Sequence, residues 1–133
     1  MTNTVTAVQL GVNGRATIVN LPSTDGESGV ATALRAVLEC RTVDVVRLAP
    51  GLDMWIDDEG LLTDGPEINR VATRIARDYG LRWQPYVGTV VFAAGDANGE
   101  PRSLSENRIT ALLATADLGG VIVVDASHHA GGK

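Results

Sequence analysis

Hydrophobic and polar residues alternate at the beginning of the chain, a pattern typical of β-strands with one buried face. Apolar side chains occupy close to every second position of residues 4–12, and a second β-type run covers residues 16–21. Asn13 and Gly14 stand between these two runs. An Asn-Gly pair favours a type I′ turn, because both central residues of that turn need a positive φ. The pattern therefore predicts an antiparallel β-hairpin.

Further β-type runs follow later in the chain. Residues 43–48 and 52–57 are separated by a Pro-Gly pair, which is the chemistry of a type II turn. We therefore expect these two runs to be antiparallel neighbours. The apolar run at residues 85–93 predicts a well-buried strand, and residues 121–124 predict a last one.

Three other segments place apolar residues at every third or fourth position, which is the spacing of one face of a helix. They cover residues 30–38, 68–79 and 109–116. Gly80 is expected to end the second helix, because glycine adopts the left-handed backbone of a helix C-terminus without steric cost.

The beginnings of these helices are predicted from side chains that accept hydrogen bonds from free backbone N–H groups. The first helix is expected to begin after Ser28, or at a capping box formed by Thr24 and Glu27. Ser103 and Glu106 have the spacing of a capping box at the start of the third helix.

The element order β-β-α-β-β-α-β-α-β predicts the fold class α+β, with a mixed β-sheet, helices packed on one face and a β-grasp-like opening. A length of 133 residues is that of a single domain, residues 1–133. We expect an ordered core over residues 4–126 and a flexible tail over residues 127–133.

Composition argues against several classes of function. A formal net charge of -5 argues against a generic binder of nucleic acid or of an anionic membrane, since attraction of the whole surface to phosphate is missing. Cys40 is the single cysteine, which excludes an internal disulfide and a multi-cysteine metal site. No apolar run approaches the length of about 18 residues that a membrane span needs, and the N-terminus is not basic. The sequence therefore predicts a cytoplasmic protein without a signal peptide or membrane span.

Three segments carry a resemblance to a known family. They are a hairpin end with an acidic turn and a glycine, an Asn-Arg-x-Ala-Thr helix start and a Val-Gly-x-Val-Val strand, at residues 52–62, 66–73 and 87–92. Over residues 33–113 the chain resembles a family of small proteins known as a domain of unknown function, common in actinobacteria, their phages and mobile elements. It departs from the family at residues 39–42, where a Gly-Gly-Tyr-like step is frequent, and its last strand lies outside the pattern. The resemblance implies a phage or mobile-element setting and assigns no catalytic residue.

No constellation of catalytic or metal-binding residues stands out. The acidic turn of Asp53 and residues 57–59 lacks the spacing of a calcium loop and has the composition that a tight turn favours. His128 and His129 are adjacent, with no third ligand nearby in the sequence, and no base is near Cys40. The chain contains neither a G-x-S-x-G elbow nor a phosphate-binding loop. We therefore expect no catalytic residue, no metal site and no cofactor.

A row of basic residues on the second predicted helix is the first candidate for a binding site. Arg70, Arg74 and Arg77 recur at helical spacing on the face away from the apolar residues, and we call them the arginine stripe. Arg82 follows just past the helix. Such a stripe can grip an anionic group or an acidic protein surface. The alternative is a solvated helix face that Asp78 partly neutralises.

Trp55 is the second candidate. Strand alternation places it with Asp53 and Asp57 on the face opposite the apolar residues of its strand. A tryptophan exposed between two carboxylates fits an interface anchor. Alternatively, Trp55 packs beneath the C-terminal segment or the loop at residues 82–83, because large aromatic side chains are seldom bare.

These features favour a small non-enzymatic protein that binds a host or phage protein, as an accessory or regulatory protein that modulates a host enzyme or a defence system. The alternative is an accessory protein that binds nucleic acid or a nucleotide through the arginine stripe, and an enzyme ranks third. The observation that separates them is whether Trp55 and the arginine stripe are exposed and adjacent. We expect no membrane partner, and nucleic acid is not favoured.

The last predicted strand favours self-association. Residues 121–124 are β-branched at every position and contain no Lys or Pro that would protect an edge. A strand added beyond the family-like region is more easily placed at an edge of the sheet than inside it. We therefore expect a homodimer in which this strand forms the contact.

Overall fold

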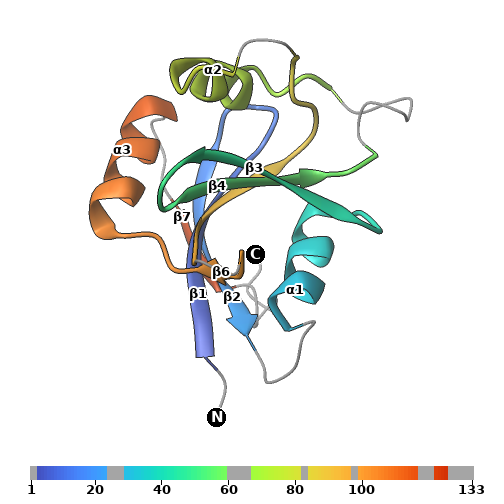
Figure 1. The fold of residues 1–133 in the computed structure, drawn as a ribbon, viewed down its shortest axis with the longest axis vertical. Helices are drawn as coiled ribbons and strands as arrows, with labels where there is room; N and C mark the ends of the chain where they lie inside the picture. The colour runs from blue at the N-terminus through green and yellow to red at the C-terminus, as the bar shows by residue number, and fades with distance from the viewer. Residues whose placement is uncertain are drawn as a thin grey trace.

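The computed structural model of the chain describes residues 3–23, 29–59, 67–81, 84–96, 99–116 and 122–125. The helices are α1 (Gly29–Leu38), α2 (Arg70–Asp78) and α3 (Glu106–Ala116). The strands are β1 (Asn3–Leu10), β2 (Ala16–Ser23), β3 (Val43–Ala49), β4 (Leu52–Asp57), β5 (Val90–Gly95), β6 (Pro101–Arg102) and β7 (Ile122–Asp125). This confirms the α+β class and the expected element order, with β6 as a short addition between β5 and α3 (Figure 1).

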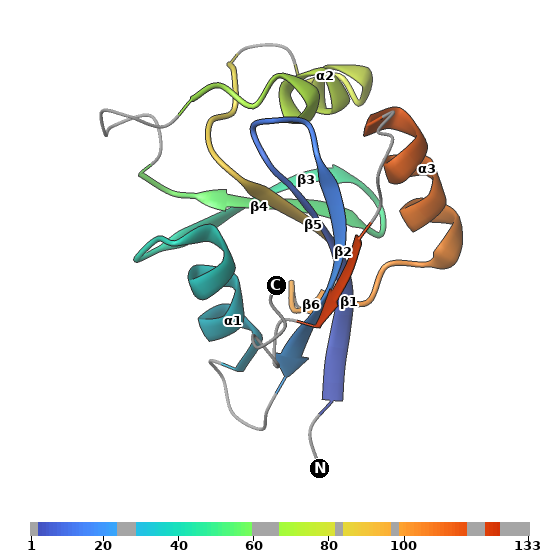
Figure 2. The same ribbon diagram turned by 180° about the vertical axis from the view of Figure 1, so that it is seen from behind.

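The strands form one mixed sheet with the spatial order β3-β4-β5-β1-β2-β7. Neighbouring strands are antiparallel except for β2 and β7, which run parallel. β6 pairs with the last residues of β5, where β1 no longer does. The strand expected at residues 121–124 is β7, and it lies at one end of this order beside β2 (Figure 2).

Helices cover both faces of the sheet, which corrects the expectation of a single covered face. One apolar cluster joins the sheet to α2 and α3, and a second joins it to α1. Successive residues of a strand alternate between the two clusters: Val8 belongs to the first and Ala7 to the second. The reason is already visible in β5, where Val90, Val91, Phe92 and Ala93 are all fully buried. A strand without a polar face requires cover on both sides.

The loop between β1 and β2 differs from the predicted type I′ turn. Leu10 pairs with Ala16, so five residues connect the strands instead of two. The N–H of Gly14 donates to the carbonyl oxygen of Gly11 at 2.9 Å, and of the loop residues only Gly14 has a positive φ, +84°. The hairpin itself is confirmed, because the glycine of the Asn-Gly pair still supplies the left-handed backbone that closes it.

The β3–β4 hairpin follows the prediction. Its strands are antiparallel, and Gly51 has φ +79°, which is the conformation a type II turn requires at that position. The strand predicted from residue 85 begins later, at Val90, since Gly88 turns the chain with φ +75° and Val87 forms only an isolated bridge with Ile68.

The ends of two helices are fixed by specific residues. Gly80 ends α2 with φ +97°, as expected, and its N–H donates to the carbonyl oxygen of Arg77. α3 begins after Ser105 instead of a capping box at Ser103: the Ser105 Oγ accepts the N–H of Arg108 at 3.2 Å. Ser103 is used elsewhere, because its Oγ accepts the N–H of Thr6 in β1 at 2.9 Å.

Some expectations fall on residues that the structure does not describe. They are the capping residues Thr24, Glu27 and Ser28 and the tail at 127–133. Among the described residues, no helix combines the length and apolar character needed to cross a bilayer.

Candidate interaction site

The position of α2 is set by a buried asparagine at its start. The Asn69 side chain is fully buried, and its Oδ1 accepts the N–H of Ala72 at 3.0 Å, which caps the helix. Its Nδ2 donates to the carbonyl oxygens of Leu10 at 3.0 Å and Gly88 at 2.9 Å. One side chain therefore ties the start of α2 to the end of β1 and to the turn before β5.

The inner side of α2 is fixed by a second set of contacts. The Thr73 Oγ1 accepts the N–H of Tyr86 at 2.9 Å, and both residues are buried. Ala72, Ile75 and Ala76 pack into the first apolar cluster. These contacts leave the opposite side of the helix in solvent.

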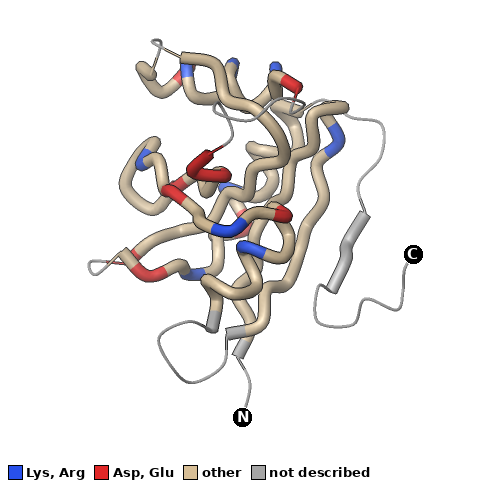
Figure 3. The backbone as a smooth tube through the Cα atoms, turned by 90° about the vertical axis from the view of Figure 1, so that its right-hand side faces the viewer, with Lys and Arg blue, Asp and Glu red and all other residues tan. Residues whose placement is uncertain are grey.

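The arginine stripe occupies this solvent side of α2. Arg70, Arg74 and Arg77 are exposed, and none of them forms an ion pair with another described residue. Arg74 instead donates from Nη2 to the carbonyl oxygen of Thr115 at 2.8 Å. Thr115 lies in the last turn of α3, and the partial negative charge at the C-terminal end of a helix favours a cation there. Figure 3 shows basic positions along α2, at the top of the molecule. Arg82 lies outside the described residues.

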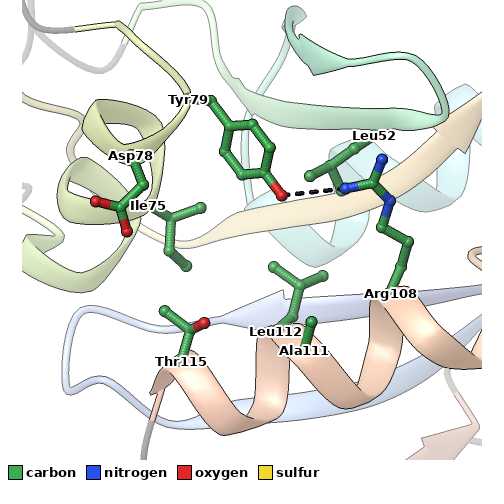
Figure 4. A pocket seen from close by; sticks show the side chains of 8 residues that line it. All are labelled: Leu52, Ile75, Asp78, Tyr79, Arg108, Ala111, Leu112 and Thr115. Atoms are coloured by element: carbon green, nitrogen blue, oxygen red, sulfur yellow. Dashed lines mark hydrogen bonds between the residues drawn. The ribbon is translucent and has the colours of Figure 1, made fainter.

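A groove runs between α2 and α3, and we call it the α2–α3 groove. It encloses about 160 Å³, and Leu52 at the start of β4 contributes to its lining. The Arg108 guanidinium reaches across the groove and donates to the Tyr79 Oη at 3.1 Å (Figure 4). It also donates to the carbonyl oxygen of Pro50 at 3.1 Å. The remaining lining is both polar and apolar, and it includes Ile75, Asp78, Leu112 and Thr115.

Trp55 is not the solvent-facing anchor that strand alternation allowed. It is half-buried and packs against the second cluster, which lies under α1. Its Nε1 is buried and has no hydrogen-bond partner among the described residues. The face of β4 that carries Trp55 was expected to meet water, but it belongs to a second apolar core. The helix α1 covers it, whereas the alternative prediction named the C-terminal segment or the loop at residues 82–83.

Trp55 and the arginine stripe are not adjacent. Trp55 packs with the cluster on the α1 side of the sheet, whereas α2 packs with the cluster on the other side. The sheet lies between them, so the two do not form one continuous surface. The candidate site therefore consists of the arginine stripe and the neighbouring α2–α3 groove.

Carboxylates of the acidic turn form ion pairs and hydrogen bonds with other described residues. Asp53 is 2% exposed, and its Oδ1 accepts the Nε of Arg47 at 2.8 Å. The Asp57 Oδ1 accepts the N–H of Glu59 at 2.9 Å, a bond within the turn, and Glu59 pairs with Arg41 at 2.8 Å. No group of three or more metal-ligating side chains occurs among the residues that the structure describes. His128 and His129 lie outside those residues.

Cys40 lies half-buried at the end of α1, on the α1 side of the sheet. Burial raises the pKa of its thiol, and the negative charges of Asp57 and Glu59 raise it further, while the charge of Arg35 opposes them. A raised pKa lowers the fraction of thiolate at neutral pH, which is the opposite of what a cysteine nucleophile requires.

Comparison with known protein families identifies the domain that contains this site. The family described as Domain of unknown function (DUF3846) matches residues 7–116. The chain belongs to this family. The DUF3846 domain therefore runs from within β1 to the end of α3, beyond both ends of the resemblance expected from sequence, and β7 follows it. No curated protein and no solved structure matches the chain.

Sequence reasoning missed two residues of the site in this DUF3846 domain. Tyr79 and Arg108 meet across the α2–α3 groove, although 29 positions separate them in the sequence. Tyr79 carries a local signal, because it continues the apolar spacing of α2 but remains 41% exposed at its C-terminus. Arg108 carries none, since its role depends on how α3 packs beside α2.

Proposed function

We propose that the protein is a small non-enzymatic accessory protein that binds an acidic surface of another protein through the arginine stripe. Its setting is the one that the sequence resemblance implies, the cytoplasm of an actinobacterial host that carries a phage or mobile element. There it would modulate a host enzyme or a defence system. The proposal keeps a host or phage protein as the partner.

A single observation carries this proposal: the arginine stripe is exposed and lacks ion pairs with described residues, on a chain of net charge -5. An unpaired cation on an acidic protein attracts an anionic partner at short range, while the rest of the surface repels nonspecific anions. Arginine also binds carboxylates in a bidentate geometry, which gives orientation as well as affinity.

The test uses charge reversal at the two stripe residues without a structural contact, in the variant R70E/R77E. Arg74 is left in place because it binds the last turn of α3. R41E/R102E is the control, with two exposed arginines reversed outside α2; their ion pairs with Glu59 and Asp96 lie at the surface, where such pairs contribute little to stability. Affinity capture from host lysate and mass spectrometry is expected to identify an acidic protein that the wild type and the control retain and R70E/R77E loses.

Capture of the same protein by R70E/R77E would overturn the proposal. The competing class, an accessory protein that binds nucleic acid, is tested with the same variants and a random DNA duplex. At physiological salt and micromolar protein we expect no binding. Binding that weakens steeply with salt and is lost in R70E/R77E would establish the competing class instead.

A homodimer formed through β7 is a separate part of the proposal. β7 ends the strand order, and among the described residues it pairs with β2 alone, which supports an edge open to a second copy. Light scattering at tens of micromolar is expected to give the mass of a dimer for the full chain and of a monomer after deletion of residues 121–133. A monomeric full chain would overturn this part and leave the arginine stripe untouched.

A further inference from the structure

The volume of the α2–α3 groove limits the kind of ligand that fits in it. Its volume of about 160 Å³ is well below the roughly 300–1,000 Å³ of pockets that enclose drug-sized ligands and cofactors. Part of its lining is apolar, from Leu52, Ile75 and Leu112, each of which belongs to the first core cluster. A hollow of this size and lining accommodates one aliphatic or aromatic side chain.

The charge around the groove indicates what flanks that side chain. Arg108 crosses the groove but donates only to neutral acceptors, the Tyr79 Oη and the Pro50 carbonyl, and forms no ion pair with a described residue. Arg74 lies at the Thr115 end, and Asp78 is the single acidic residue in the lining. Together, the arginine stripe and the groove lining contain four guanidinium groups and one carboxylate, and the exposed Glu67 and Glu106 lie outside this set at the starts of α2 and α3.

The two residues that bridge the groove are already ordered for binding. The Tyr79 side chain is 41% exposed, and its Oη accepts a hydrogen bond from Arg108, so the phenolic hydrogen remains free to be donated. Arg108 likewise keeps further N–H groups beyond the two in use. Tyrosine and arginine are the residue types that dominate binding energy at protein interfaces, and ordering them beforehand lowers the entropic cost of binding.

We infer that the α2–α3 groove takes one aliphatic or aromatic side chain of a partner segment whose neighbouring residues carry carboxylates. The apolar side chain packs against Ala111 and Leu112, with Ile75 and Leu52 beneath them. A flanking carboxylate accepts hydrogen bonds from Arg108 and Tyr79, and the arginine stripe binds the acidic residues that follow. This inference rests on the proposed function, because it names the kind of segment that the arginine stripe recognises.

The experiment titrates three blocked pentapeptides into the full chain and follows backbone amide signals by NMR. The first probe has a central Phe between pairs of Glu, the second has Ala in place of Phe, and the third has Gln in place of every Glu. A111L narrows the groove, because Ala111 lines it and is exposed on α3. A114L is the matched control, since Ala114 is exposed on the same helix and does not line the groove.

We expect the first probe to bind and to shift signals of α2 and α3. Replacement of Phe by Ala is expected to weaken binding about tenfold or more, the effect of losing one buried aromatic side chain. Replacement of Glu by Gln is expected to weaken binding and to remove its salt dependence. A111L loses affinity for the first probe by a similar factor, and A114L does not.

Equal binding of the Phe and Ala probes, with no effect of A111L, would overturn this inference and leave the proposed function in place. Absence of all binding at about 1 mM probe, the weakest affinity expected of a specific contact, would overturn it as well. Equal binding of the Glu and Gln probes would overturn the carboxylate requirement. The capture experiment with R70E/R77E tests the proposed function independently of the peptides. Failure of the groove inference is therefore distinguishable from failure of the proposed function.

Discussion

The side-chain amide of Asn69 donates to the carbonyl oxygen of Gly88 at 2.9 Å and so joins the start of α2 to the turn that precedes β5. The same amide nitrogen donates to Leu10 at the end of β1. Leu10 is the last residue of β1, and Gly88 lies in the turn before β5. Asn69 therefore holds the helix that carries the arginine stripe at a fixed place above the sheet.

Asn69→Ala is expected to lower the free energy of unfolding by about 3 kcal/mol. Loss of the helix cap accounts for about 1 kcal/mol of this, and loss of the two hydrogen bonds donated by Nδ2 accounts for about 1 kcal/mol each. Chemical denaturation measures the change. Asn107→Ala is the control, because Asn107 is exposed on α3, and a change within about 0.5 kcal/mol is expected there. A similar small change for Asn69→Ala would contradict the role assigned to its side chain.

Asn69→Asp separates the cap from the two donated hydrogen bonds. A carboxylate can still accept the N–H of Ala72, but it has no hydrogen to donate to Leu10 or Gly88. We expect this variant to be strongly destabilised at neutral pH and to recover part of its stability at acidic pH, where the protonated carboxyl donates one hydrogen bond. A variant as stable as the wild type at pH 7 would show that the cap alone matters.

The pattern of apolar residues predicted the helices and the main strands because each element buries at least one face. The two-residue β6 was missed, since two residues contain no periodicity. The number of covered faces was predicted wrongly, although Val90, Val91, Phe92 and Ala93 form an uninterrupted apolar run. The predicted type I′ turn between β1 and β2 was wrong, because the Asn-Gly pair is compatible with more than one loop length.

The start of α3 offers a direct comparison of two neighbouring serines. Ser105→Ala removes the acceptor for the N–H of Arg108 and is expected to cost about 1 kcal/mol. Amide hydrogen exchange at Arg108 should then speed up. Ser103→Ala loses the bond to Thr6 in β1 and should leave exchange at Arg108 unchanged. In the capping box predicted from sequence the Ser103 Oγ would accept the N–H of Glu106, so faster exchange at Glu106 in Ser103→Ala would favour that box.

The thiol of Cys40 is expected to react slowly in the folded protein. Its pKa is raised, first by burial and then by Asp57, so less of the reactive thiolate forms at pH 7.5. Iodoacetamide should therefore alkylate Cys40 more slowly in the native state than in urea. Because the native state holds this proton more tightly, the associated stability is present below the pKa of the unfolded thiol and is lost as the pH rises through the folded pKa.

The source of this shift is tested by removing one charge. Asp57→Asn is expected to lower the pKa of Cys40 and to speed alkylation of the native protein. Asp78→Asn is the control, since α2 packs on the other side of the sheet and should leave the rate unchanged. Equal rates in the native protein and in urea would show that burial does not protect the thiol.

The candidate site was partly predictable. Helical spacing predicted the arginine stripe, because exposure of one helix face follows from burial of the other. The surroundings of Trp55 were not predictable, since the identity of the helix that covers a strand face is a property of the tertiary arrangement. The α2–α3 groove was missed for the same reason: Leu52, Tyr79 and Arg108 come from three elements that only the fold brings together.

Gly95 leaves room for the ion pair between the buried Asp53 and the exposed Arg47. A Cβ at position 95 would collide with the Asp53 Oδ2 and would lie 3.3 Å from the Arg47 Nη2. Gly95→Ala is therefore expected to cost about 2 kcal/mol of unfolding free energy. In an Asp53→Ala background most of this cost should vanish, whereas in Asp53→Asn, which keeps the volume of the side chain, it should persist. Denaturation of the single and double variants measures these differences, and an equal cost in all three backgrounds would show that the close approach to Asp53 is not its cause.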